Sequence, residues 1–115
     1  MDKDNGLVMK QAADMGHTQA ALDVLAERCR QVEAEGWTPE HDDTHSHGEM
    51  AAAAACYAFT GAQSPHEITN RIWPWSFDWW KPVDNRRNLV KAGALIIAEI
   101  ERLDRAAIAK ATGAK

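Results

Sequence analysis

Cysteine is scarce in this sequence, and its placement excludes two classes of site. Cys29 and Cys56 are the only two cysteines, so the chain has neither a disulfide framework nor a cysteine zinc site. Both lie in apolar helical patterns, where a thiol is a small buried hydrophobe and not an activated nucleophile. The seven glycines are dispersed, which excludes a glycine-rich phosphate loop.

Long hydrophobic runs and excess positive charge are also missing. The longest stretch without a charged residue is 50–66, and it contains Gly61 and Pro65, so it cannot supply the roughly 20 apolar residues that cross a bilayer. Residues 1–5 lack the features of a secretory signal. We therefore expect a cytoplasmic protein without membrane contacts. A net charge of −4, from 13 Lys and Arg against 17 Asp and Glu, argues against general nucleic-acid binding.

The residues that are present indicate a single all-α domain over residues 1–115. Twenty-one residues are alanine, the strongest helix former. Apolar residues at steps of three and four predict a first helix over 18–35 that ends at Gly36. The expected core face of this helix is Leu22, Leu25, Cys29 and Val32. We expect residues 1–16 to form a weakly ordered N-terminal segment.

A second helix is predicted from Ser46 to about Gly61. Ser46 and Glu49 are spaced as a capping box, in which each side chain bonds the backbone N–H of the other residue. One side of this helix is lined by Met50, Ala53, Ala54 and Tyr57. Its five consecutive alanines allow close packing. Ser64 followed by Pro65 predicts a further short helical turn with the same kind of cap.

The third and longest helix is predicted to begin at Asp84. Its apolar positions recur in steps of four and three, at Leu89, Gly93, Ile96, Ile100, Leu103 and Ala107. Glu101 and Arg105 are spaced for an exposed ion pair, and residues 110–115 are predicted to be a frayed tail. The three helices predict a small antiparallel bundle. So short a chain is also expected to form a homo-oligomer.

Four of the five tryptophans lie in one segment between the last two helices. They are Trp73, Trp75, Trp79 and Trp80. Pro74 and Pro82 in the same segment oppose regular secondary structure. We therefore expect an ordered loop that closes one end of the bundle and is held in place by its aromatic side chains.

Potential metal ligands are concentrated in a loop rich in histidine and aspartate. The candidates are Asp43, His45, His47 and Glu49. Imidazole and carboxylate ligands together would suit a divalent metal such as Zn²⁺, Mn²⁺ or Ni²⁺. Two alternatives stay open: Glu49 completes the capping box beside solvated histidines, or the loop is a metal-free polar site at a helix N-terminus.

Positive charge gathers at the start of the third helix, where free backbone N–H groups also favour anions. A nucleotide requires aromatic planes beside cationic groups, to stack the base and bind the phosphates. The predicted ligand-binding residues are Trp73, Trp75, Trp79, Trp80, Lys81, Arg86, Arg87 and Lys91. Alternatively, the tryptophans only cap the bundle while the cations are solvated or paired with Asp78 and Asp84, or the loop docks on another protein.

Several segments together resemble a family of short proteins from bacteriophage and prophage genomes. They are RQVEAEGWTPEHDD at 30–43, HGE at 47–49, WPW with WWKP at 73–82, and LVKAGALI through EIERLDR at 89–105. The order of these motifs is also distantly similar to the MazG-like all-α NTP pyrophosphohydrolases. That second resemblance implies a helical fold with a crevice that faces phosphate groups.

The MazG-like enzymes bind Mg²⁺ through a Glu-Glu-x-x-Glu cluster on one helix and a Glu-x-x-Asp pair on the next. Glu49 matches the last glutamate of the first motif, but His45 and Ser46 stand where its first two glutamates would be. Asn88 and Lys91 stand near the carboxylates of the second motif. The resemblance thus implies a phosphate-binding crevice without the carboxylates that hydrolysis uses.

These features favour a phage-encoded protein that holds a nucleotide-type ligand without consuming it, and so sequesters a nucleotide signal of a host defence. An alternative is a metal-dependent nucleotide pyrophosphohydrolase that uses the four candidate metal ligands and a divalent metal as cofactor. Another is a small inhibitor whose tryptophan-rich loop docks on a host defence protein. The three hypotheses differ in whether the chain binds a nucleotide, hydrolyses one, or needs none.

Overall fold

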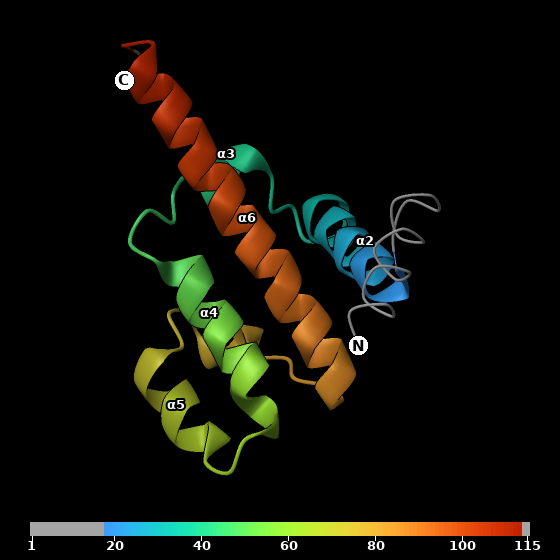
Figure 1. Ribbon diagram of the computed structural model, residues 1–115. Helices are drawn as coiled ribbons and strands as arrows, with labels where there is room; N and C mark the ends of the chain where they lie inside the picture. Colours follow the sequence, from blue (N-terminus) through green and yellow to red (C-terminus); the bar gives the residue numbers. More distant parts are fainter. Residues whose placement is uncertain (1–17, 114–115) are drawn as a thin grey trace, which may run out of the picture.

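The computed structural model describes residues 18–113. This part of the chain contains five helices, two short 3₁₀ turns and no strand, which confirms the all-α fold (Figure 1). The helices are α2 (Gln19–Glu33), α3 (Pro39–Asp42), α4 (Glu49–Ala58), α5 (Pro65–Ile72) and α6 (Asn85–Ala111). The predicted weakly ordered segment 1–16 lies outside the described residues. None of the helices in 18–113 has the length and apolarity needed to cross a membrane.

The centre of the core is the contact between α4 and α6, which run side by side in opposite directions (Figure 1). The predicted core side of α4 is confirmed, because Met50, Ala53, Ala54 and Tyr57 are all buried. They pack against Ala92, Leu95 and Ala98 of α6. Small side chains on both helices let the backbones approach closely, so a few larger residues suffice to fill the space between them.

Helix α2 contacts α6 through a polar face, and its predicted apolar core face is wrong. Leu22 and Leu25 are more than 40% exposed and Cys29 is exposed, so this cysteine is not the buried hydrophobe that was expected. The buried residues of α2 are instead Glu27, Arg28 and Gln31. Ion pairs compensate the buried charges of Glu27 and Arg28, and this offsets the free-energy cost of burying them.

The apolar stripe that the spacing of residues predicts along α6 is also largely exposed. Leu89, Ile96, Ile100 and Leu103 are 47–51% exposed. A second apolar face of α6, formed by alanines around Leu95, packs on α4 instead. Gly93 is the exception in the stripe, since it faces α2: a Cβ there would lie 3.2 Å from both methyl groups of Val24, closer than ordinary van der Waals contact.

The ends of the helices agree only in part with the predicted caps. Asp84 accepts a hydrogen bond from the Arg87 backbone N–H at 2.9 Å, and Gly36 follows α2 with a φ of +75°, as expected for a stop. The Ser46 cap is wrong: α4 begins at Glu49, and Gly48 precedes it with a φ of +82° and no side-chain cap. The left-handed turn at Gly48 leaves Ser46 outside the first helical turn.

Two further boundaries refine the predictions. Helix α5 begins at Pro65 as expected, but the Ser64 side chain forms no capping hydrogen bond. Helix α6 continues to Ala111 and ends at the Thr112 cap, so the first two residues of the predicted frayed tail are helical. Residues 114–115 lie outside the described part.

The caps give a first testable prediction. We expect Ser46→Ala to change the free energy of unfolding by less than about 0.5 kcal/mol, because the Ser46 hydroxyl caps no helix. Thr18→Ala should cost about 1 kcal/mol, because Thr18 accepts a hydrogen bond from the Ala21 backbone N–H at 3.3 Å. Urea denaturation of both variants measures the difference. Equal losses would mean that Ser46 caps α4 after all.

Candidate functional site

The tryptophan-rich loop between α5 and α6 is ordered by contacts with the core. Trp73, Trp75 and Trp80 are partly buried against the α4–α6 core, and so is Trp37 from the segment after α2. The Trp73 ring lies edge-on to Trp75 and to Trp80, with ring centres 5.5 and 4.9 Å apart. Trp79 differs from these residues, because 57% of its surface is exposed. The loop therefore has an anchored side and an exposed side.

One cavity, of about 420 Å³, lies where this loop faces the start of α3. We call it the aromatic pocket, and its walls are Glu35, Trp37, His41, His45, Trp73, Trp75, Ser76 and Trp79. The rings of Trp37 and His41 are nearly parallel, with their centres 6.3 Å apart. His45 leans on Trp75 with a centre distance of 5.2 Å. The pocket presents several aromatic faces to any flat ligand.

A second cavity, of about 350 Å³, adjoins it and is lined by α2, α6 and the loop. We call it the basic pocket, and its walls are Glu27, Arg30, Gln31, Glu35, Trp37, Tyr57, Trp79, Lys81, Arg87, Lys91 and Leu95. Glu35, Trp37 and Trp79 line both pockets. Four predicted ligand-binding residues, Trp79, Lys81, Arg87 and Lys91, meet in the basic pocket, while Trp73 and Trp75 line only the aromatic one. Trp80 contributes to the core beneath and lines neither pocket.

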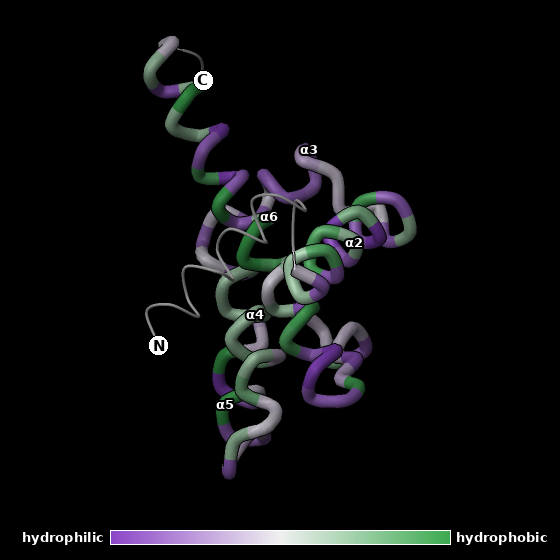
Figure 2. Tube along the Cα trace, turned by 45° about the vertical axis from the view of Figure 1, so that its right-hand side comes forward, coloured by the Kyte–Doolittle hydropathy of each residue, from purple (hydrophilic) through white to green (hydrophobic). Residues whose placement is uncertain are grey.

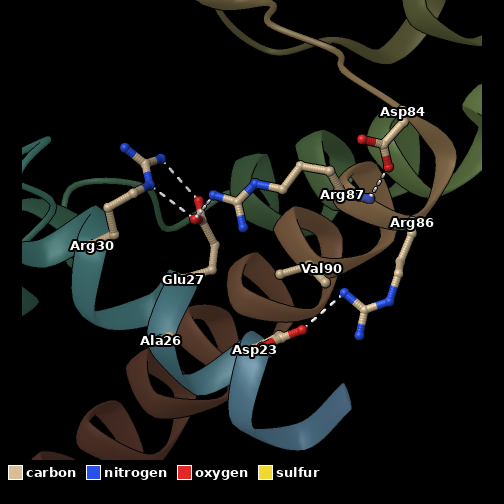
Figure 3. Close-up of a pocket in the computed structure, with 8 residues that line it drawn as sticks. All are labelled: Asp23, Ala26, Glu27, Arg30, Asp84, Arg86, Arg87 and Val90. Carbon is tan, nitrogen blue, oxygen red and sulfur yellow. Dashed lines mark hydrogen bonds and ion pairs between the residues drawn. The ribbon is translucent and has the colours of Figure 1, made fainter. Parts of the chain in front are cut away.

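Glu27 organises the cationic wall of the basic pocket. Its side chain is fully buried, and Figure 3 shows it between Arg30 and Arg87. Arg30 donates two hydrogen bonds to the carboxylate at 2.8 and 2.9 Å, Arg87 donates another, and the Gln31 amide donates one at 3.2 Å. Burial alone would raise the pKa of Glu27, but the two guanidinium groups outweigh burial and lower it. The carboxylate is therefore ionised and holds both arginines in place.

Lys91 supplies a further cation from the next turn of α6. Its ammonium group donates a hydrogen bond to the Lys81 carbonyl at 2.7 Å and lies 5.4 Å from the centre of the Tyr57 ring. Burial, and then the charge of Arg87, lowers the pKa of Lys91. An anionic ligand would offset both effects, since an opposite charge stabilises a partly desolvated ammonium group.

Arg86 lines neither the aromatic nor the basic pocket, so the structure does not bring it together with the other predicted ligand-binding residues there. It forms an ion pair with Asp23 at 2.8 Å, and its side chain is 61% exposed (Figure 3). This pair lines a further hollow between α2 and the start of α6, which adjoins the basic pocket because Glu27, Arg30 and Arg87 line both. Neighbouring residues on a helix point in directions about 100° apart, so Arg86 reaches Asp23 while Arg87 reaches Glu27. The alternative in which these arginines pair with Asp84 does not hold, because their guanidinium groups pair with Asp23 and Glu27, and the Asp84 carboxylate caps α6.

The four predicted metal ligands are not brought together as a set. Asp43 is paired with Arg105 at 2.8 Å, and Glu49 accepts a hydrogen bond from the His47 backbone N–H at 2.7 Å. His45 comes within 3.9 Å of Glu49 but also forms the wall of the aromatic pocket. Within residues 18–113, no three His, Cys, Asp or Glu side chains are grouped closely enough to hold a metal ion.

Sequence reasoning missed the contribution of α2 to the basic pocket. Glu27, Arg30 and Gln31 are spaced three and four residues apart, which places them on one face of a helix. This spacing could have indicated a buried polar face, but the apolar stripe on the same helix was predicted to be the buried face instead. Trp37 and Tyr57 were also missed as pocket walls, because they come from elements that only the folded chain brings to the loop.

The adjoining pockets combine two chemical properties: several aromatic faces, and cations fixed by a buried carboxylate. Comparison with known proteins adds no further guide to their ligand. No protein-family model matches the chain, and no curated protein or solved structure shows significant similarity to it.

Proposed function

We propose that the protein binds a nucleotide-type ligand, with the base in the aromatic pocket and the phosphates in the basic pocket. The observation that carries this proposal is the shared wall of the two pockets, formed by Glu35, Trp37 and Trp79. A nucleotide joins a flat base to anionic phosphates over a short distance. Base stacking on aromatic rings and charge-assisted hydrogen bonds to phosphates are the usual means of holding such a ligand.

The charge of the basic pocket supports the assignment of phosphates to it. Its cations are Arg30, Lys81, Arg87 and Lys91, against the carboxylates of Glu27 and Glu35, so four positive charges face two negative ones. Arg87 directs one Nη2 donor to Glu27, and Lys91 directs one to a carbonyl. Both groups have further donors, which can bind phosphate oxygens.

The state of the carboxylates favours binding over hydrolysis. Glu27 already accepts hydrogen bonds from two arginines and a glutamine, so it presents little capacity to a metal ion or a water nucleophile. The cysteines offer no substitute, because burial raises the pKa of the Cys56 thiol, and Cys29 lines neither pocket. In line with the phage resemblance, the ligand would be a host nucleotide signal that the protein withdraws from its receptor.

Equilibrium binding to a nucleotide panel tests this function. Isothermal titration with ATP, GTP, CTP, UTP and their monophosphates should show saturable binding of at least one, and chromatography should recover it intact after incubation with Mg²⁺ or Mn²⁺. Catalytic release of pyrophosphate, abolished by a chelator, would replace the proposal with the pyrophosphohydrolase. Binding of no nucleotide, together with capture of a host protein that depends on Trp79, would replace it with the docking inhibitor.

We also propose that two copies pair through the exposed stripe of α6. The protomer is open, with a radius of gyration of 16.4 Å, whereas about 13 Å is typical of a compact domain of this size. The C-terminal half of α6 extends beyond the other helices (Figure 1), and apolar and polar stretches alternate along it (Figure 2). The four-then-three spacing of the stripe is that of a seam between paired helices.

The exposed area fits a second copy as the occupant. Six large apolar residues on α2 and α6 are 42–51% exposed, so a partner could cover on the order of several hundred Å² per protomer. That area is comparable to the largest apolar patch of a typical monomer and approaches the requirement of a stable dimer. A symmetric pair would cover the same stripe on both copies.

Light scattering after size-exclusion chromatography checks this pairing. The wild type should elute as a dimer at micromolar concentration, and Ile100→Asp should elute as a monomer, because a charge at the centre of the seam would be buried without a partner. Val83→Asp is the matched control, since Val83 is 61% exposed but lies in the loop before α6. A monomeric wild type, or a dimeric Ile100→Asp variant, would contradict the proposed seam.

A further inference from the structure

Two buried side-chain polar atoms in residues 18–113 lack a hydrogen-bond partner, and each belongs to a residue that lines one of the two adjoining pockets. They are the side-chain oxygen of Gln31, a residue of the basic pocket, and the indole N–H of Trp75, a residue of the aromatic pocket. Buried polar groups are nearly always hydrogen-bonded in folded proteins, so each exception needs an explanation. One of these atoms is an acceptor and the other is a donor.

The surroundings of Gln31 fix which end of its amide is unsatisfied. Its nitrogen donates to Glu27 Oε2 at 3.2 Å, and the reverse orientation would direct the amide oxygen at a carboxylate. The residue is only 2% exposed, and its backbone carbonyl accepts a hydrogen bond from the Trp37 N–H at 3.0 Å. Gln31 is therefore held rigidly, and its side-chain oxygen is an acceptor without a donor among the described residues. The residue lines the same pocket as the cations.

Trp75 is held just as firmly on the other side of the shared wall. Its ring contacts Trp37, His45 and Trp73, with ring centres between 5.2 and 6.2 Å apart. An indole N–H can only donate, so the missing partner is an acceptor. Ring nitrogens and carbonyl oxygens of a nucleobase are acceptors of this kind.

We infer that the ligand bridges both pockets, so that a sugar hydroxyl donates to Gln31 Oε1 while the base accepts from Trp75 Nε1. This inference rests on the proposed nucleotide function. If the base occupies the aromatic pocket and the phosphates bind Arg87 and Lys91, the sugar lies between them, beside the shared wall. Its hydroxyl groups are the only hydrogen-bond donors in that part of a nucleotide. Gln31 then selects a nucleotide that retains a sugar hydroxyl.

Loss of the hydroxyl should be costly because Gln31 Oε1 has no partner within residues 18–113. A site that is built to hydrogen-bond a ligand hydroxyl discriminates strongly against the analogue that lacks it, since the buried acceptor is then left unpaired. We expect a 2′,3′-dideoxynucleotide to bind about 10- to 100-fold more weakly than its parent. Gln31→Met removes the acceptor while it keeps the length of the side chain, so this variant should bind both forms with similar affinity.

The experiment compares ATP and GTP with their 2′,3′-dideoxy counterparts by isothermal titration against four forms of the full chain. The forms are the wild type, Gln31→Met, Trp75→Phe and the control Gln19→Met. Gln19 is an exposed glutamine of α2 whose amide donates to Asp23 at 2.8 Å. Circular dichroism checks that each variant is folded. Trp75→Phe should weaken parent and dideoxy forms by the same factor, because it removes a contact with the base and not with the sugar.

Each outcome decides a separate question. A wild-type preference for the parent nucleotide that disappears in Gln31→Met, and persists in Gln19→Met, supports the inference. Equal binding of both forms by the wild type overturns it, because the Gln31 acceptor then takes a buried water instead, and leaves nucleotide binding itself intact. A preference that survives Gln31→Met also overturns it. Binding of no nucleotide rejects the proposed function.

Discussion

Arg28→Met should lower the free energy of unfolding by about 3 to 5 kcal/mol. The Arg28 guanidinium lies 2.9 Å from Asp42 and 3.0 Å from Glu101, and so ties α2 to α3 and α6. The Asp42 side chain is only 1% exposed. Without Arg28, its carboxylate would remain buried with no full charge to compensate it, and this uncompensated charge is the cause of the loss.

An exposed ion pair next to this one provides the matched control. Arg105 lies 2.8 Å from Asp43, and its pair joins α6 to the end of α3, but the Asp43 side chain is 51% exposed. Arg105→Met should cost only about 0.2 to 1 kcal/mol. Urea denaturation compares the two variants. Adding Asp42→Leu to Arg28→Met should restore part of the lost stability, since it removes the uncompensated carboxylate. If Arg28→Met and Arg105→Met lowered the free energy of unfolding equally, burial of the carboxylate would not be the cause of the loss.

The helices themselves could be predicted from local residues. Alanine content, the Asp84 cap and the stop at Gly36 act within a few positions of the chain, so they are visible in the sequence. The buried side of α4 was also predictable, because its neighbouring face offers few large apolar residues that could compete for the core.

The faces of α2 and α6 could not be predicted in the same way. Each carries a stripe of large apolar residues at helical spacing, and spacing alone cannot say whether a stripe packs within the chain or is left exposed. Alanines around Leu95 form the contact with α4, because small residues permit closer approach. The predicted Glu101–Arg105 ion pair is replaced by pairs with residues distant in the sequence: Glu101 pairs with Arg28, and Arg105 pairs with Asp43.

The candidate site was half visible in the sequence. Trp79, Lys81, Arg87 and Lys91 are close along the chain and meet in one pocket, so their composition was enough to predict them. The opposite wall comes from α2, where Glu27 lies 60 residues before Arg87, and it depends on how that helix crosses α6. Contacts between distant residues, such as Glu27 with Arg87 and Arg28 with Glu101, hold this crossing, and no local pattern encodes them.

Lys91→Met should weaken nucleotide binding about 10- to 100-fold, because a charge-assisted hydrogen bond contributes about 1.5 to 3 kcal/mol. Lys91 lines the basic pocket and is only partly exposed, and within residues 18–113 it has no carboxylate partner at ion-pair distance. Its removal therefore takes a cation from the site without stranding a buried charge. Substitution of Lys91 tests the site more directly than substitution of Arg87, because loss of Arg87 would also remove a hydrogen bond to the buried Glu27 carboxylate.

Arg86→Met separates the pocket from general electrostatic attraction. Both substitutions remove one positive charge from the first turns of α6, so any effect of net charge is the same for the two variants. Arg86, however, is bound to Asp23 outside the pockets, and its loss should leave nucleotide affinity within about twofold, since exposed ion pairs contribute little. Isothermal titration at a fixed salt concentration compares the two variants with the wild type. Equal weakening by both would mean that phosphates are attracted by the charge of this helix end and not held by the basic pocket.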